Sequence, residues 1–124
     1  MKISKNFKPK SEYHSLSTNN SEDKTCCLKF SQCDDNKYQL WCLGREDIKR
    51  FISYAKKVES LKWQQIKTHH GLNYETLNNM TIPDYIDNDV SIKSMRVDGK
   101  FRVIGYRSEE FFYILWFDNN HETC

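Results

Sequence analysis

Four basic residues lie close together near the C-terminal end of the sequence, and a histidine follows them. The basic residues are Arg96, Lys100, Arg102 and Arg107, and the histidine is His121. Cations held in a fixed geometry stabilise negative charge on a phosphate. Histidine is the side chain that titrates near neutral pH without a large perturbation. Together these residues could bind a phosphate and move a proton at a neighbouring oxygen.

Two turns divide this stretch into three segments of β-forming residues. Asp98-Gly99 suits a tight turn with positive φ, and the polar residues 107–110 separate the second segment from FFYILWF. We therefore predict an antiparallel three-strand meander over residues 95–121. Residues at even spacing share a strand face, so Arg102 should lie with Ile104 on the face opposite Arg107. The simpler alternative is that these cations form only a solvated sheet face, and that His121 is a surface residue.

The preceding segments predict a hairpin and two helices. TCCLKFSQC alternates, and KYQLWCL follows turn residues, which predicts a β-hairpin over residues 25–43. Residues 46–70 read as helix, short break, helix. The first helix has one apolar stripe, from which we expect the following residues to pack on the meander: Phe51, Ile52 and Ala55. Residues 72–90 read mainly as loop, with one further helical turn possible after Asn73.

These segments predict an α+β fold, in which a helical hairpin packs on an antiparallel sheet that ends in the meander. Residues 1–24 are polar and lack a period, so we expect a flexible basic arm before a single domain over residues 25–124. The net charge of +2 does not by itself argue for nucleic-acid binding. Glu75 and Glu109 are both candidates for a general base, and the sequence does not choose between them.

The five cysteines include no CxxC pair, and no apolar signal segment opens the sequence. We therefore expect a cytoplasmic protein with reduced thiols and no association with a membrane. A zinc site drawing on Cys33, His69, His70 or His121 is the alternative use of these side chains. Those residues lack paired ligand spacing, so no metal and no other cofactor is predicted.

The C-terminal stretch resembles a family of toxins. The residues that carry the resemblance are Met95-Arg96, Gly99-Lys100, Arg102 and Gly105, followed by FYILWFD and then Asn120-His121. This pattern is similar to the C-terminal half of RelE/HigB-like toxins, especially phage- and plasmid-associated members whose last strand reads ILWxDxNH. The resemblance covers roughly residues 46–121, and the expected β-helix-helix-β-β-β order agrees with it.

The resemblance implies a ribosome-dependent endoribonuclease that cuts messenger RNA by attack of a ribose 2′-hydroxyl on the neighbouring phosphate. Arg102 matches an arginine after the first meander turn, and His121 matches an acid/base histidine after the last strand, so both are catalytic candidates. Arg96, Lys100 and Arg107 would contact phosphate or RNA. The implied partners are an antitoxin and the ribosome with its message. The alternative is a non-catalytic protein on the same scaffold that inhibits a host or phage protein.

Overall fold

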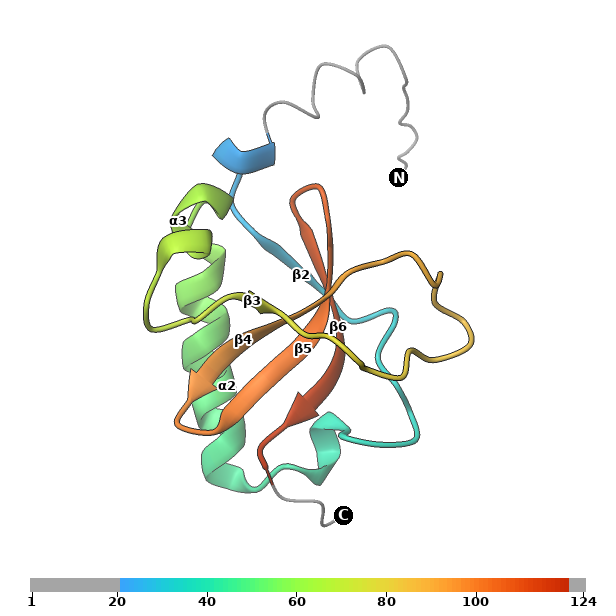
Figure 1. Cartoon of the computed structure of the whole chain (residues 1–124). Helices are drawn as coiled ribbons and strands as arrows, with labels where there is room; N and C mark the ends of the chain where they lie inside the picture. The colour runs from blue at the N-terminus through green and yellow to red at the C-terminus, as the bar shows by residue number, and fades with distance from the viewer. Residues whose placement is uncertain (1–20, 121–124) are drawn as a thin grey trace, which may run out of the picture.

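The computed structural model describes residues 21–120, which form an α+β fold with a five-stranded mixed sheet and two α-helices (Figure 1). In chain order the elements are η1 (Ser21–Asp23), β2 (Cys27–Lys29), η2 (Leu40–Cys42), α2 (Arg45–Glu59), α3 (Trp63–Thr68), β3 (Glu75–Thr76), β4 (Ile92–Asp98), β5 (Phe101–Ser108) and β6 (Phe111–Asp118). Residues 1–20 of the predicted arm lie outside the described residues. Its last residues, 21–24, belong to the fold. No helix in the described part of the chain is long and apolar enough to cross a membrane.

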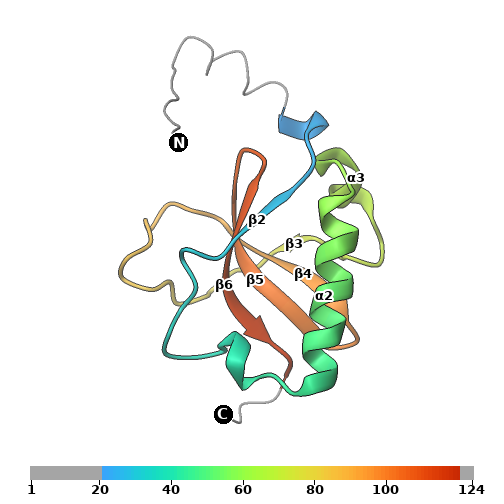
Figure 2. The ribbon, with the colours of Figure 1, turned by 180° about the vertical axis from the view of Figure 1, so that it is seen from behind.

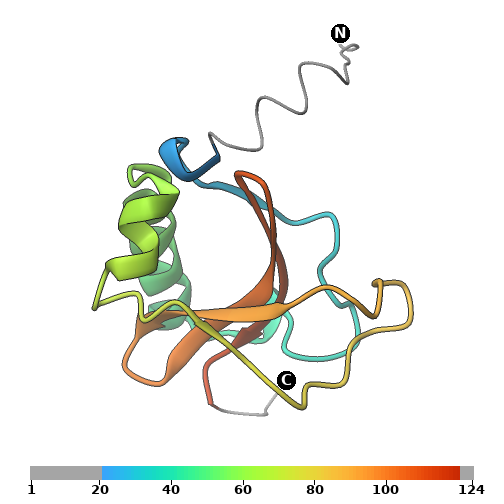
Figure 3. The ribbon, with the colours of Figure 1, turned by 45° about the horizontal axis from the view of Figure 1, so that its top comes forward.

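The sheet has the strand order β2-β6-β5-β4-β3. β2 pairs with β6 in parallel, whereas the other neighbouring strands are antiparallel. A parallel pair needs a long connection, and here the chain between the two strands includes both helices and the rest of the sheet. Figures 2 and 3 show that α2 and α3 lie together on one face of the sheet.

The predicted meander is present as β4, β5 and β6. Gly99 in the first turn has a φ of +56°, a conformation that glycine adopts without steric cost. The register between β5 and β6 shifts between Ile104 and Gly105. A Cβ atom at Gly105 would lie 1.9 Å from the backbone oxygen of Tyr113, so only glycine fits this close approach of two strands.

The two predicted helices are present, but the buried face of α2 differs from the predicted stripe. Its buried side chains are Phe51, Tyr54 and Val58. Ile52 is 48% exposed, so the expectation that it packs on the sheet is wrong. The apolar stripe omitted Tyr54, whose hydroxyl lies 3.4 Å from the sulfur of Met95 in the core. Including this tyrosine rotates the buried face away from Ile52.

The predicted hairpin over residues 25–43 is absent. β2 has three residues and pairs with β6, while residues 40–42 form the 3-10 helix η2 instead of a second strand. Polar contacts with β6 account for this path. The indole Nε1 of Trp116 donates to a carboxylate oxygen of Asp34 at 2.8 Å, and the backbone N–H of Phe117 donates to the carbonyl of Tyr38 at 2.7 Å. These bonds hold the segment against β6, where it cannot turn back on β2.

Both faces of the sheet are covered. The helix face buries the larger cluster, which includes Trp63, Phe112 and Ile114. On the opposite face Ile104, Leu115 and Trp116 are buried with partly buried side chains from residues 77–90. The further helical turn expected after Asn73 is absent, because β3 begins at Glu75 and pairs with β4. The long segment between β3 and β4 therefore acts as a second cover for the core.

Candidate functional site

Arg96 and Arg102 are direct cross-strand partners in the β4–β5 pair. Their sequence neighbours Met95 and Val103 are buried in the core beneath the helices. Side chains alternate along a strand, so the two arginines project from the opposite face. Arg96 is exposed, and so is Lys100 in the turn that joins the two strands. We call Arg96, Lys100 and Arg102 the hairpin cation cluster.

One carboxylate reaches this cluster. Nη1 of Arg102 lies 3.4 Å from Oε2 of Glu75, and the two side chains are 41% and 44% exposed. No ion pair or side-chain hydrogen bond of Arg96 occurs within residues 21–120. Like charges placed directly opposite each other destabilise a strand pair, and a bound anion would offset that cost. Glu75 is thus the one of the two general-base candidates that lies beside these cations.

The end of β6 lies next to the hairpin cation cluster. Asp118 is the register partner of Arg102 on the side away from Arg96. One carboxylate oxygen of Asp118 accepts a hydrogen bond from the backbone N–H of Asn120 at 2.9 Å, and the Asn119 amide donates to Asp47 at 2.8 Å. His121 lies outside the described residues.

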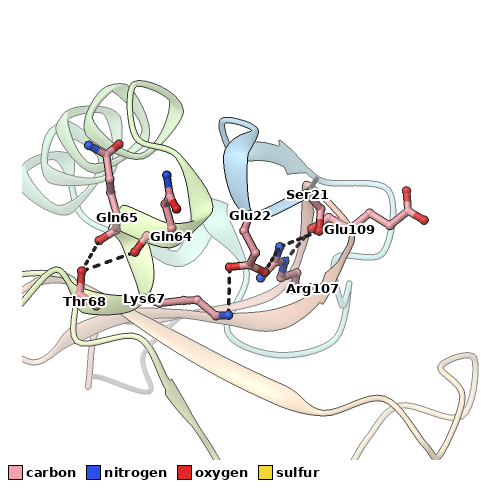
Figure 4. Close-up of polar contacts among 8 residues, drawn as sticks. All are labelled: Ser21, Glu22, Gln64, Gln65, Lys67, Thr68, Arg107 and Glu109. Atoms are coloured by element: carbon pink, nitrogen blue, oxygen red, sulfur yellow. Dashed lines mark hydrogen bonds and ion pairs between the residues drawn. The ribbon is translucent and has the colours of Figure 1, made fainter. Parts of the chain in front are cut away.

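Arg107 lies elsewhere, on the helix face of β5, as the strand period predicts. Its side chain is 14% exposed, and its guanidinium stacks 4.1 Å from the centre of the Trp63 ring. Nε donates to the backbone carbonyl of Glu109 at 2.6 Å, and Nη2 lies 3.2 Å from the hydroxyl oxygen of Ser21 (Figure 4). Nη2 also forms a 2.9 Å ion pair with Glu22. These contacts separate Arg107 from the other two predicted phosphate contacts, Arg96 and Lys100, and from Arg102.

Glu22 connects Arg107 to a second group of cations. Oε1 of Glu22 lies 2.9 Å from Nζ of Lys67, and the adjacent acid Asp23 lies 3.7 Å from Nζ of Lys62 (Figure 4 draws the Lys67 pair). The hydrogen bond from Lys67 and the charge of Arg107 lower the pKa of Glu22, although burial acts against this shift. We call Glu22, Asp23, Lys62, Lys67 and Arg107 the η1 cluster.

The sequence did not predict the η1 cluster. Glu22 and Asp23 fell within the arm that we expected to be flexible. The one available signal was that two adjacent acids end a segment whose charged residues are otherwise mostly lysines. Nothing in the sequence indicates that these two acids contact α3, which begins more than 35 residues later, because the contacts arise from the tertiary fold.

Among the free cysteines of residues 21–120, Cys27 is exposed, whereas Cys26 is buried and Cys33 is partly buried. Burial raises the pKa of the Cys26 thiol to about 12 and that of the Cys33 thiol to about 11, so both stay protonated and weakly nucleophilic at neutral pH. Cys42 is disulfide-bonded, which contradicts the expectation that all thiols are reduced. Within the same residues, no group of three or more His, Cys, Asp and Glu side chains is arranged to hold a metal ion.

Comparisons of the chain with protein-family models, with curated proteins and with solved structures found no match. Function must therefore be argued from the two charged clusters.

Proposed function

We propose that this chain is a RelE-like toxin of a toxin–antitoxin or mobile-element system, and that it cleaves messenger RNA on the ribosome through the hairpin cation cluster. The observation that carries the proposal is that Arg96 and Arg102 are direct cross-strand partners beside the exposed turn between β4 and β5. A phosphate bound between them would relieve the repulsion between two like charges. Ribosomes place this activity in the cytoplasm.

The order of the elements supports the same proposal. A short strand, two helices and the meander follow one another in the described chain, with the short β3 added before the meander. Apart from the added β3, this order follows the β-helix-helix-β-β-β order that the resemblance to RelE/HigB-like toxins implies. The segment of strongest resemblance, residues 95–121, includes the end of β4 together with β5 and β6, which carry the hairpin cation cluster.

The proposed mechanism assigns separate tasks to the residues around the reacting phosphate. The ribose 2′-oxygen forms a new bond to phosphorus, the bond from phosphorus to the leaving 5′-oxygen breaks, and a 2′,3′-cyclic phosphate results. Negative charge builds on the nonbridging phosphate oxygens in the transition state, and Arg102 stabilises this charge because a strand holds it in place. Glu75 orients the Arg102 guanidinium through their 3.4 Å contact. Arg96 and Lys100 bind neighbouring phosphates. His121 moves a proton to or from a ribose oxygen, since an imidazole exchanges protons near neutral pH.

A non-catalytic protein inhibitor on the same scaffold is the second candidate. The observation that favours it is the exposure of large apolar side chains: Trp41 is 64% exposed, Phe30 is 49% exposed and Ile52 is 48% exposed. Phe30 also packs edge-on against the buried Phe51 of α2, with ring centres 6.3 Å apart. Exposed apolar patches mark protein–protein contacts. The partner would be an antitoxin or a host or phage protein.

Induced expression in a bacterial host tests the proposal. The wild type, Arg102→Ala and Arg96→Ala should be compared for growth and for new 5′ ends in ribosome-bound messages. Lys49→Ala is the matched control, because it removes an exposed lysine that belongs to α2 and not to the β4–β5 pair. We expect wild type and control to arrest growth and generate new ends, and the arginine variants to do neither. Growth arrest without new ends, equal for all four proteins, would favour the protein inhibitor.

A further inference from the structure

The short turn η1 places two carboxylates on three cations from other elements. Glu22 pairs with Lys67 and Arg107, both at 2.9 Å, and Asp23 pairs with Lys62 at 3.7 Å. Asp23 also accepts a hydrogen bond from the Gln64 amide at 3.3 Å. Two of these cations come from the beginning and the end of α3, and the third comes from β5. Two negative charges thus cover a surface that would otherwise carry three positive charges.

The cationic surface does not depend on η1 for its shape. Arg107 is held independently by the Glu109 carbonyl at 2.6 Å and by the Trp63 ring at 4.1 Å. Trp63 is itself fixed, because its indole Nε1 donates to the carbonyl of Glu110 at 2.9 Å. A guanidinium with a fixed plane is preorganised for a phosphate oxygen. If η1 moved away, Arg107 would remain in place.

The attachment of η1 to the rest of the fold is weak. Its carboxylates are 42% and 69% exposed, and exposed ion pairs contribute little to stability. Within the described chain, its backbone bond is the one from the Lys24 N–H to the Ser21 carbonyl, at 3.2 Å. From Lys24 onward the chain is held firmly. The Lys24 carbonyl accepts from the Trp63 N–H at 3.0 Å, and Thr25 pairs with Lys62. Lys24 therefore marks a point at which η1 can detach while β2 stays paired.

We propose that η1 is a self-docked mimic of a nucleic-acid backbone, and that its displacement exposes a second phosphate-binding surface formed by Lys62, Lys67 and Arg107. Two adjacent carboxylates on separate cations resemble two successive phosphates of a single strand. The inference deepens the proposed action on RNA and rests on it. RNA reaching this surface competes with Glu22 and Asp23, so the turn restrains binding until a strand displaces it.

Direct binding measurements test this inference. The probe is a fluorescein-labelled single-stranded oligoribonucleotide, and its anisotropy reports binding to the full chain. The test variant is Glu22→Gln/Asp23→Asn, which removes both carboxylates and keeps their shape. The matched control is Glu46→Gln/Glu59→Gln, which raises the net charge by the same amount on the exposed surface of α2. Circular dichroism checks that both variants are folded.

We expect the η1 variant to bind the oligoribonucleotide about tenfold more tightly than wild type, and the control to change affinity less than twofold. The salt dependence of log Kd should steepen by about 1.4, because two phosphates take the place of the two carboxylates and roughly 0.7 counterions are released per phosphate contact on a single strand. Adding Lys62→Ala/Lys67→Ala to the η1 variant should remove the gain. Adding Arg102→Ala to the η1 variant should leave the gain in affinity from the η1 substitutions unchanged, which separates this surface from the hairpin cation cluster.

Three outcomes would overturn the inference. Equal tightening in the control would mean that net charge alone governs binding. An unchanged affinity in the η1 variant would mean that the carboxylates do not compete with phosphate. Preferential binding of labelled oligoglutamate over the oligoribonucleotide would assign the surface to an acidic peptide. Inorganic phosphate, added as a competitor, distinguishes a free anion from a strand, because a strand engages all three cations and resists displacement.

Discussion

Replacing Arg107 by leucine should destabilise the fold, because one side chain makes four separate contacts. It stacks on Trp63 at 4.1 Å, donates to the Glu109 carbonyl at 2.6 Å and pairs with Glu22 at 2.9 Å. It also reaches Ser21 at 3.2 Å. A largely desolvated cation–π contact contributes about 1–2 kcal/mol, and a charged hydrogen bond about 1.5–3 kcal/mol. The ion pair adds little, since Glu22 is 42% exposed.

These terms overlap, so we expect Arg107→Leu to lower the free energy of unfolding by about 2–4 kcal/mol. Arg107→Lys should lie between leucine and wild type, because it keeps the charge and loses the planar fork and the stacking. Glu22→Gln should cost less than about 1 kcal/mol, as expected for an exposed pair. Urea unfolding followed by circular dichroism and by tryptophan fluorescence measures all three.

Two results would refute this reasoning. If Arg107→Leu cost under about 0.5 kcal/mol, as surface substitutions usually do, the stacking and the carbonyl bond would have no energetic weight. If Glu22→Gln cost as much as Arg107→Leu, the ion pair would dominate and η1 would be too firmly bound to detach.

Phe51→Ala should cost about 3–5 kcal/mol and Ile52→Ala less than about 1 kcal/mol in urea unfolding, because Phe51 is buried and Ile52 is half exposed; equal costs would contradict the observed face of α2. Gly105→Ala should cost at least about 1–3 kcal/mol, since its Cβ meets a backbone oxygen at 1.9 Å; an unchanged unfolding midpoint would argue against the close approach. Because the folded pKa of Glu22 lies below its usual 4.5, its contribution is complete at neutral pH and is lost as pH falls through the folded value. Wild type should therefore lose stability below about pH 4.5 more steeply than Glu22→Gln, and parallel acid titrations would contradict this.

Local chemistry sufficed to predict the meander and the helices. The Asp98-Gly99 turn and the long β-forming segments determine their strands by local preference, and α2 follows from a helical period. The prediction of a hairpin over residues 25–43 was wrong, because the segment after β2 is held by contacts with β6, a strand that lies far away in the sequence. Periodicity carries no information about such contacts.

For the candidate site, the sequence predicted on which sheet face a side chain lies but not which residues from other elements contact it. Strand period placed Arg102 and Arg107 on opposite faces, and the structure agrees. The cross-strand pairing of Arg96 with Arg102 was not predicted, because it depends on a register shift between Arg96 and Asp98 that the turn residues do not reveal. The partners Glu75 and Glu22 were not assigned, because each reaches its arginine from another element across the fold.

We propose that the hairpin cation cluster cleaves messenger RNA on the ribosome. The most direct test incubates purified protein with ribosomes programmed with a defined, end-labelled message, and resolves the products by length. We expect that wild type cuts the message, that Arg102→Ala is slower by about 10²–10³-fold, and that His121→Ala is slower by about 10²–10⁴-fold. An uncut message with wild type, or cutting by Arg102→Ala at the wild-type rate, would contradict it.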